Sequence, residues 1–174
     1  MESIGFDLDD VLYNFADPAY RELQVYHRLS ATYTEFWGNH LKYYTEEFWK
    51  NFIKIETLYS CEKITPQDLV VLNYLAEKYN IYYITNRPPE ILIATQNWLK
   101  RESLPYPENL ILTDKKEVEI SRLNIIAFTE DQIKNIKKIP DTIKIFLKDK
   151  PWNQNWEKEN VIRIYSLMEI LKCL

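Results

Sequence analysis

The sequence is poor in glycine and in cysteine, with two residues of each among 174. A P-loop and a GxGxxG dinucleotide turn each need closely spaced glycines, so both motifs are absent. Cys61 and Cys173 are too few and too far apart to form a disulfide framework or a zinc site. This cysteine usage predicts a reducing, cytoplasmic environment.

The sequence also lacks a long apolar run and an excess of basic residues. No apolar segment approaches the ~20 residues that span a bilayer, and the N-terminus has no basic region before an apolar stretch. We therefore expect no signal peptide and no membrane partner. The net charge of -4 provides no basic field for a polynucleotide backbone. A local basic pocket for a small phosphate remains compatible with it.

Three acids follow a short apolar run near the start of the chain. Residues 4–6 predict a buried strand, and Asp7, Asp9 and Asp10 come directly after it. In an extended segment the side chains of Asp7 and Asp9 point to the same side. Two close carboxylates repel each other unless a cation or a shared proton lies between them, and Mg²⁺ prefers such oxygen ligands. The alternative is an acidic turn in which Asp10 caps a helix.

The rest of the chain predicts strands that alternate with helices. The predicted strands comprise residues 4–6, 81–84, 110–112, 125–128, 143–147 and 161–164. The predicted helices between and after them comprise residues 65–79, 88–101, 115–123, 132–139 and a last helix ending at 174. This alternation indicates an α/β fold with a central parallel sheet of the Rossmann-like type.

The stretch between the first two strands is too long for an ordinary connection. Helices are expected over residues 17–29, 30–44 and 45–59, with Asp17 as the N-cap of the first. We therefore expect a small helical cap inserted after the first strand. The predicted domains are an α/β core of residues 1–13 and 65–174, and a cap of residues 14–64. Most of the many aromatic residues of this stretch should fill the interior of the cap, and a few should stack on a flat substrate group. His27 and His40 are expected to be surface or cap residues rather than metal ligands.

Polar residues follow three of the predicted strands. In an open parallel sheet, ligands bind beyond the carboxyl ends of the strands. The polar residues there are Asp7 and Asp9, then Thr85, Asn86 and Arg87, then Glu130 and Asp131, with Lys116 before the last pair. Each has an ordinary explanation: a helix cap for Thr85, a surface lysine for Lys116, an ion pair for Arg87. Their convergence at one edge favours a site.

These groups suit the hydrolysis of a phosphate monoester. Asp7 would be a carboxylate nucleophile that forms an aspartyl-phosphate. Mg²⁺ would be held by Asp7 and an acid after the later strand. Thr85, Asn86 and Lys116 would bind the phosphoryl oxygens. Asp9 would protonate the leaving oxygen and then activate the water.

The pattern resembles that of the haloacid dehalogenase-like (HAD) phosphohydrolases and, more narrowly, their 5'(3')-deoxyribonucleotidase branch. The residues that carry the resemblance are Asp7-Leu8-Asp9-Asp10-Val11-Leu12, Phe15, Ile84-Thr85-Asn86-Arg87-Pro88, Trp98-Leu99, Lys116, Glu130-Asp131 and Pro151-Trp152-Asn153. The resemblance implies a HAD core with Asp7 as nucleophile and Asp9 as acid–base, the backbone carbonyl of Asp9 binding Mg²⁺. It makes Asp131 a metal ligand with Glu130 as its neighbour, and Phe15 a residue that contacts substrate.

Some positions depart from the family pattern. Asp10 stands where a small glycine is usual, and the fourth motif is Thr129-Glu130-Asp131-Gln132, which leaves the direct metal ligand open between Glu130 and Asp131. Either Lys115 or Lys116 could be the motif lysine, and the resemblance favours Lys116. Trp152 is expected to pack under the last loop.

The sequence therefore predicts a magnesium-dependent phosphatase whose substrate is a small phosphorylated molecule, with a deoxynucleoside monophosphate favoured. The alternatives are a HAD phosphatase for another small phosphometabolite and a catalytically silent binding protein. A receiver-type signalling domain is disfavoured because no isolated acid ends a mid-chain strand. A DxD sugar-nucleotide transferase is disfavoured because no donor domain is evident. The sequence leaves the oligomeric state open, with a homodimer as one option.

Overall fold

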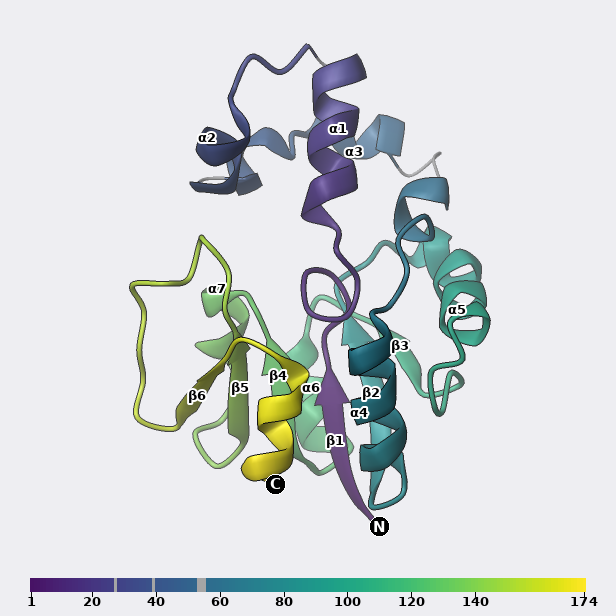
Figure 1. The fold of residues 1–174 in the computed structure, drawn as a ribbon, viewed down its shortest axis with the longest axis vertical. Coiled ribbons are helices and arrows are strands. Elements are labelled where there is room, and N and C mark those ends of the chain that lie inside the picture. The colour runs from purple at the N-terminus through teal and green to yellow at the C-terminus, as the bar shows by residue number, and fades with distance from the viewer. Residues whose placement is uncertain (27, 39, 53–55) are drawn as a thin grey trace.

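The structure, a computed structural model, describes residues 1–174 except 27, 39 and 53–55. Its centre is a sheet of six strands in the order β3-β2-β1-β4-β5-β6, paired in parallel throughout (Figure 1). The strands are β1 (Glu2–Phe6), β2 (Tyr79–Thr85), β3 (Leu110–Leu112), β4 (Ile125–Glu130), β5 (Lys144–Lys148) and β6 (Val161–Ile164). The predicted α/β fold is confirmed. The strand order reverses direction between β1 and β4, and such a switch point is where open parallel sheets bind ligands.

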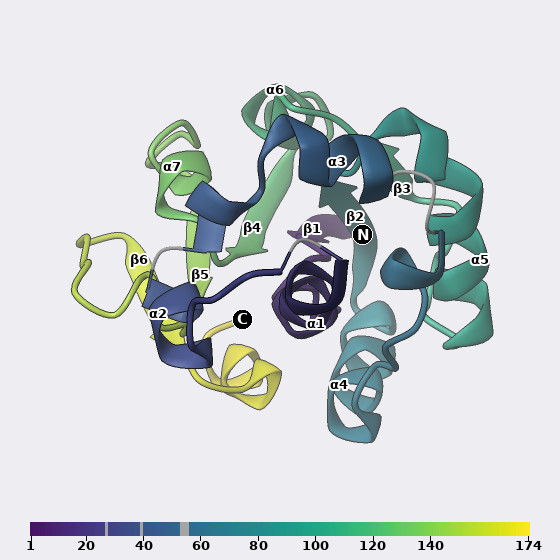
Figure 2. The same ribbon diagram turned by 90° about the horizontal axis from the view of Figure 1, so that it is seen from above.

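Helices cover both faces of the sheet, as Figure 2 shows from above. Helix α4 (Pro66–Ala76) and the terminal 3₁₀ helix η4 (Leu167–Lys172) pack on one face, and α6 (Lys116–Arg122) and α7 (Ile133–Ile136) on the other. Helix α5 (Leu92–Arg101) follows the short 3₁₀ helix η3 (Pro89–Ile91) beside β2 and β3. Alternate strand residues therefore enter two different apolar clusters, one under α4 and η4 and one under α6 and α7.

Gly5 is the point of closest approach within the sheet. A Cβ atom at this position would lie 2.7 Å from the ring of Phe128, which is fully buried on β4. Gly5 pairs with Phe128 across the two strands, so glycine leaves the room on the sheet face that the Phe128 ring occupies.

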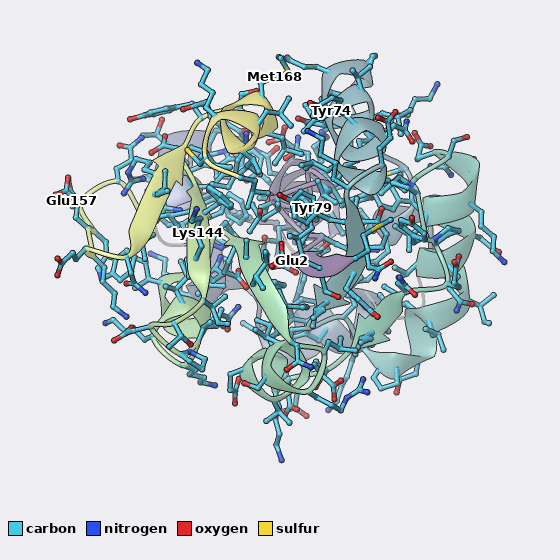
Figure 3. The ribbon with its side chains drawn as sticks, turned by 90° about the horizontal axis from the view of Figure 1, so that it is seen from below. Glu2, Tyr74, Tyr79, Lys144, Glu157 and Met168 are labelled. Carbon is cyan, nitrogen blue, oxygen red and sulfur yellow. The ribbon has the colours of Figure 1, made fainter. Side chains whose placement is uncertain are left out.

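The residues between β1 and α4 form short helices beyond the carboxyl ends of the strands (Figure 1). They are α1 (Ala16–Tyr26), α2 (Tyr33–Gly38), η1 (His40–Tyr43), α3 (Glu46–Phe52) and η2 (Glu56–Tyr59). Phe36 and Phe48 are fully buried among them, as expected for aromatic residues that fill a cap. Figure 3 views the opposite end of the molecule, where Glu2, Tyr79 and Lys144 mark the amino ends of β1, β2 and β5.

Several predicted helices prove shorter or start elsewhere. The helix expected over 30–44 is split into α2 and η1, because α2 ends at Gly38, a residue that favours helix termini. The one expected over 45–59 is α3 and η2, and residues 53–55 lie outside the described part. The helix expected over 132–139 spans only Ile133–Ile136. The last helix is a 3₁₀ segment, which starts at a capping box between Ser166 and Glu169.

Helix α1 begins one residue before Asp17, which is therefore not its N-cap. The Ala16 N–H instead donates to Asp10 Oδ1 at 3.1 Å, so the side chain of Asp10 satisfies the first turn. His27 lies outside the described residues. Among the described helices, none is both long and apolar enough to cross a bilayer.

Candidate active site

The carboxyl ends of β1, β2 and β4 meet at one pocket. Phe6 pairs with Tyr83 on β2 and with Thr129 on β4, and the next residue, Asp7, donates its N–H to the Thr129 carbonyl at 2.9 Å. The pocket has a volume of about 140 Å³. Of the residues predicted for the site, those that line it are Asp7, Asp9, Phe15, Thr85, Asn86, Arg87, Lys116 and Asp131, and Asp10 joins them. Glu130 lies behind this lining.

Lys116 is the lysine that reaches the acids. Its Nζ lies 2.7 Å from Asp7 Oδ2 and 2.8 Å from Glu130 Oε2, and all three side chains are buried. The neighbouring Lys115 is exposed. Burial alone would lower the pKa of Lys116, but the charges of Asp7 and Glu130 raise it instead. Lys116 is therefore charged across the whole range in which the protein would work.

Glu130 has its hydrogen-bonding capacity filled by the protein. Its Oε1 accepts the backbone N–H groups of Asp131 and Gln132 at 3.1 and 3.0 Å, and its Oε2 accepts from Lys116 and, at 3.1 Å, from the Asn135 amide. Burial opposes ionisation, yet the Lys116 charge and these bonds lower the pKa of Glu130 overall. Glu130 is thus an ionised carboxylate that holds Lys116 in place.

Among the described residues, the Asp131 carboxylate accepts hydrogen bonds from neutral donors only. Its Oδ2 accepts from Trp152 Nε1 at 2.9 Å and from Gln132 Nε2 at 2.8 Å. Burial, and then the charge of Glu130, raises the pKa of Asp131 well above its usual value, and the same two causes act on Asp7. Both carboxylates therefore carry a charge that nearby cations compensate incompletely.

These acids fit a divalent cation. A carboxylate oxygen of Asp7, one of Glu130 and one of Asp131 lie within 4.8 Å of one another, and only the Lys116 ammonium is paired with this set among the described residues. Hard oxygen donors in a negatively charged, buried setting suit Mg²⁺. Since each Glu130 oxygen already accepts two hydrogen bonds from the protein, the better-placed ligands are Asp7 and Asp131.

Asp9 has a different partner on the β2 side of the pocket. Nε of Arg87 lies 3.0 Å from each carboxylate oxygen, and Nη2 lies 2.5 Å from Oδ1. The Arg87 side chain has no exposed surface, whereas that of Asp9 is 24% exposed. This is the ion pair that the sequence offered as the alternative to a phosphate contact for Arg87.

Asp10 adopts a left-handed backbone conformation with φ of 61°. Glycine is favoured in this region, and aspartate is among the few other residues that tolerate it. Burial raises the pKa of Asp10 to about 7, against the opposing charge of Lys150. Together with its bond to Ala16, this conformation makes Asp10 part of the turn that leads from β1 into α1.

Thr85 and Asn86 offer donors to the pocket. The Thr85 hydroxyl is buried and has no hydrogen-bond partner among the described residues. A buried hydroxyl of this kind costs free energy unless a ligand or a water molecule satisfies it. Asn86 is exposed at the pocket rim. Both residues line the pocket together with Asp7.

An aromatic wall closes the pocket on the side of the inserted helices. The ring of Phe15 lies 6.3 Å from that of Trp49 in a stacked arrangement, 5.9 Å from Tyr44 and 5.2 Å from Tyr59. Tyr44 and Trp49 also line a neighbouring cavity of about 370 Å³ together with Leu41, Asn86, Pro88 and Lys134. The small polar pocket thus opens beside a larger space with aromatic sides.

The loop after β5 supports Asp131. The Asn153 amide donates to the carbonyl of Asp131 and to that of Lys148, both at 2.9 Å. Trp152 stacks face to face on Trp37, with centroids 5.2 Å apart and planes 3° apart, and lies 4.1 Å from the ring of His40. Trp152 therefore packs between the inserted helices and the core, and it also contacts a predicted metal ligand.

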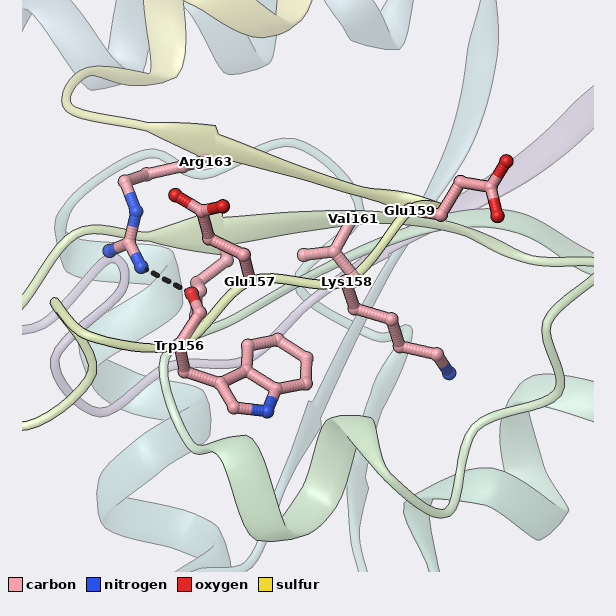
Figure 4. A pocket seen from close by; sticks show the side chains of 7 residues that line it. Trp156, Glu157, Lys158, Glu159, Val161 and Arg163 are labelled. Atoms are coloured by element: carbon pink, nitrogen blue, oxygen red, sulfur yellow. Dashed lines mark hydrogen bonds between the residues drawn. The ribbon is translucent and has the colours of Figure 1, made fainter.

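A larger cavity, of about 490 Å³, lies elsewhere, between β6 and the loop before it (Figure 4). Trp156 and Arg163 line it, and Arg163 donates to the carbonyl of Trp156 at 2.8 Å, to Asp149 at 2.6 Å and to Asn153. Its arginine is thereby engaged in holding the loop, and the acids of the metal cluster are not among its lining residues. The chemistry is therefore expected at the smaller pocket.

The chain is similar in sequence to bacterial nucleotidases. It is 29% identical over 115 residues to a nucleotidase from Clostridium acetobutylicum, an alignment covering 65% of the chain and 60% of that protein. It is 31% identical over 124 residues to a provisionally named nucleotidase from Halalkalibacterium halodurans, covering 69% and 64%. The chain thus spans less than two thirds of the length of both relatives. No protein-family model matches it.

The fold is also that of solved hydrolases. A HAD-superfamily hydrolase of subfamily IA from Geobacter sulfurreducens superposes with a TM-score of 0.66, covering 100% of both chains at 12% identity. A HAD hydrolase of family IA from Entamoeba histolytica superposes with a TM-score of 0.67, covering 97% of this chain and 95% of that one at 12% identity. The chain therefore has the fold of the haloacid dehalogenase-like hydrolases. At this identity the structural likeness concerns the fold alone.

Sequence reasoning missed several residues that line the pocket: His40, Leu41, Tyr44, Trp49, Tyr59, Gln132, Lys134 and Asn135. The aromatic richness of residues 14–64 indicated that some rings would face the site. It did not indicate which, because the inserted helices are too short for their periodicity to define a face. Gln132 is the last residue of the fourth motif, next to Asp131, and this adjacency was the one signal for it.

Proposed function

We propose that the chain is a magnesium-dependent phosphomonoesterase that works through an aspartyl-phosphate, with residues 14–64 as its cap. The observation that carries this proposal is the pocket in which Asp7 lies beside Lys116, Asp131 and the unpartnered hydroxyl of Thr85. A nucleophile, a fixed cation, a pair of metal-binding carboxylates and a free donor are the parts that phosphoryl transfer requires.

In the first half of the reaction an oxygen of Asp7 attacks phosphorus, and the bond from phosphorus to the leaving oxygen breaks. Asp9 gives its proton to that oxygen, so the alcohol leaves neutral. Thr85, Asn86 and Lys116 donate to the phosphoryl oxygens, on which transition-state charge is spread.

In the second half a water oxygen attacks the phosphorus of the Asp7 phosphate. Asp9, now a carboxylate, takes the proton of the water, and the bond from phosphorus to Asp7 breaks. Inorganic phosphate leaves, and both aspartates return to their starting forms. Mg²⁺, held by Asp7, Asp131 and the Asp9 carbonyl with Glu130 behind them, would supply charge neutralisation at the phosphoryl oxygens.

We propose a deoxynucleoside monophosphate as the substrate. The small pocket suits a phosphoryl group, and the adjoining cavity with Tyr44 and Trp49 suits a flat, hydrophobic ring attached to it. The sequence similarity to proteins named nucleotidases supports the same substrate class.

A panel of phosphomonoesters tests this function. Phosphate release would be measured with Mg²⁺ for deoxyribonucleoside and ribonucleoside 5'- and 3'-monophosphates, sugar phosphates and p-nitrophenyl phosphate. We expect turnover of deoxynucleotides, its loss on chelation, and at least a roughly 10⁴-fold loss in Asp7→Asn, a variant that should remain folded.

Three outcomes would overturn parts of this proposal. Turnover of sugar phosphates without nucleotides would move the protein to another phosphometabolite. Full activity after chelation would exclude the role of Mg²⁺, and full activity in Asp7→Asn would exclude Asp7 as nucleophile. Nucleotide binding without turnover of any ester would indicate a silent binding protein.

A further inference from the structure

Arg87 lies where the chain enters and leaves the inserted helices. Its guanidinium carbon is 4.8 Å from the centre of the Tyr13 ring, in the incoming connection between β1 and α1. It is 4.9 Å from the centre of the Tyr59 ring, at the start of the outgoing connection that leads to α4. Nη1 donates to the Tyr59 carbonyl at 3.3 Å and to the Thr95 hydroxyl of α5 at 3.2 Å. One side chain thereby contacts both connections and the core helix beside them.

The two connections are also joined to each other and to the loop of Asp9. The Tyr13 hydroxyl donates to the carbonyl of Leu58, and the Tyr13 carbonyl accepts the N–H of Asp10 at 2.6 Å. Tyr13 is fully buried and lies edge-on to Trp98 of α5 at 5.2 Å. A shift of either connection would therefore move the groups that surround the guanidinium.

The edge of the Arg87 guanidinium formed by Nε and Nη2 binds the Asp9 carboxylate. The contacts of Nε and Nη2 with both oxygens define the plane of the carboxylate as well as its position, which a lysine cannot do. Nε and both Nη atoms already donate to protein oxygens, and no part of the side chain is exposed. An arginine in this state is poorly suited to bind a phosphate, which would have to break the pair first.

We propose that Arg87 is a positioning residue that orients the carboxylate of Asp9 and couples this orientation to the two connections of the cap. In this arrangement a change in the position of the cap is accompanied by a change in the orientation of the Asp9 carboxylate. The inference rests on the proposed acid–base role of Asp9 for its kinetic consequence. The mechanical coupling itself does not depend on that role.

The coupling can be tested without activity, by amide hydrogen exchange of residues 58–64 in wild type, Arg87→Lys and Asp9→Asn. Among the described contacts, Arg87 links the Asp9 carboxylate to this segment, because it binds both the carboxylate and the Tyr59 carbonyl. We expect faster exchange there in both variants, by roughly tenfold or more, with little change in β5. Unchanged exchange of this segment in Asp9→Asn would overturn the coupling, even if the protein proves to have no phosphatase activity.

The kinetic arm uses a double-mutant cycle. We expect Arg87→Lys to lower kcat for nucleotides roughly 10- to 100-fold with KM nearly unchanged, and to have a smaller effect on p-nitrophenyl phosphate, whose leaving group needs little protonation. In an Asp9→Asn background the same change should cost less than roughly twofold, because the group that it positions is gone.

Arg101→Lys is the matched control. Arg101 is an exposed arginine of the same helix as Thr95 and donates to the carbonyl of Ser60 at 2.7 Å, on the outgoing connection, without contacting Asp9. It should leave kcat unchanged. Full additivity of Arg87→Lys and Asp9→Asn, or a rise in KM at constant kcat, would make Arg87 a substrate ligand or a purely structural residue and overturn the positioning role.

Discussion

The two sides of the pocket bind their aspartates with different kinds of donor. On the β2 side Asp9 faces a buried guanidinium, which balances its charge. On the β4 side Asp131 is held by an indole and an amide, which are neutral donors and leave its charge uncompensated. An acid that is neutralised by an arginine has little attraction left for a metal ion, whereas an acid held by neutral groups keeps it. This difference in donor type matches the proposed division, with proton transfer at Asp9 and metal binding at Asp131.

The strongest test of this comparison is to neutralise each aspartate in turn. We expect Asp9→Asn to lower kcat roughly 10²- to 10⁴-fold while leaving the Mg²⁺ concentration for half-maximal activity nearly unchanged. We expect Asp131→Asn to raise the Mg²⁺ concentration for half-maximal activity roughly 10- to 100-fold. Mg²⁺ titrations of phosphate release measure both. Equal effects of the two variants on the Mg²⁺ requirement would contradict the division.

A milder test removes one neutral donor. Trp152→Phe deletes the N–H that binds Asp131 but keeps an aromatic ring against Trp37. We expect a roughly tenfold weaker affinity for Mg²⁺ or Mn²⁺, measured by direct binding, with kcat at saturating metal little changed. Trp156→Phe, in the cavity between β6 and the loop before it, serves as the control and should leave the affinity unchanged.

The smallest expected effect is on the stability of the folded protein at acidic pH, and it concerns His40, which lies next to Trp152. His40 is buried against Trp152, and burial, with a smaller contribution from Lys134, lowers its pKa to about 4. In the unfolded chain the pKa of a histidine is about 6.5, so as the pH falls below 6.5 the unfolded chain takes up a proton that the folded protein does not. The free energy of unfolding therefore decreases as the pH falls from 6.5 towards 4, and it is unaffected by the titration of His40 above that range. The contribution of His40 is on the order of 3 kcal/mol.

Thermal unfolding measured at several pH values checks this expectation. Between pH 6.5 and 4 the wild type should lose more stability than His40→Phe, which keeps a ring but cannot be protonated. The carboxyl groups of the site titrate in both proteins, so the difference between the two curves isolates His40. Parallel curves would show that His40 does not resist protonation.

The parts of the structure that follow from local chemistry could be predicted from the sequence. An apolar run in the sequence indicates each buried strand. In a parallel sheet the residues that follow the strands lie at the same edge. That reasoning places Asp7, Thr85 and Asp131 in one pocket. It also offers the alternative for Arg87 that the structure contains, although it could not choose between the two.

What could not be predicted depends on contacts between distant segments. Arg87 meets Asp9 across 78 positions, and Trp152 meets Asp131 across 21. Neither spacing leaves a periodic signal. The inserted helices are shorter than the predicted ones, and α2 ends at Gly38. The position of Lys116 rather than Lys115 likewise depends on where α6 begins against β4.

The stack of Trp37 on Trp152 has an optical consequence. Two indoles that lie face to face with planes 3° apart couple their electronic transitions, and one belongs to the inserted helices while the other belongs to the loop after β5. Any movement of these helices away from the core would separate the pair and change the circular dichroism and fluorescence of the protein. The molecule therefore carries its own spectroscopic reporter of opening, placed one hydrogen bond away from Asp131.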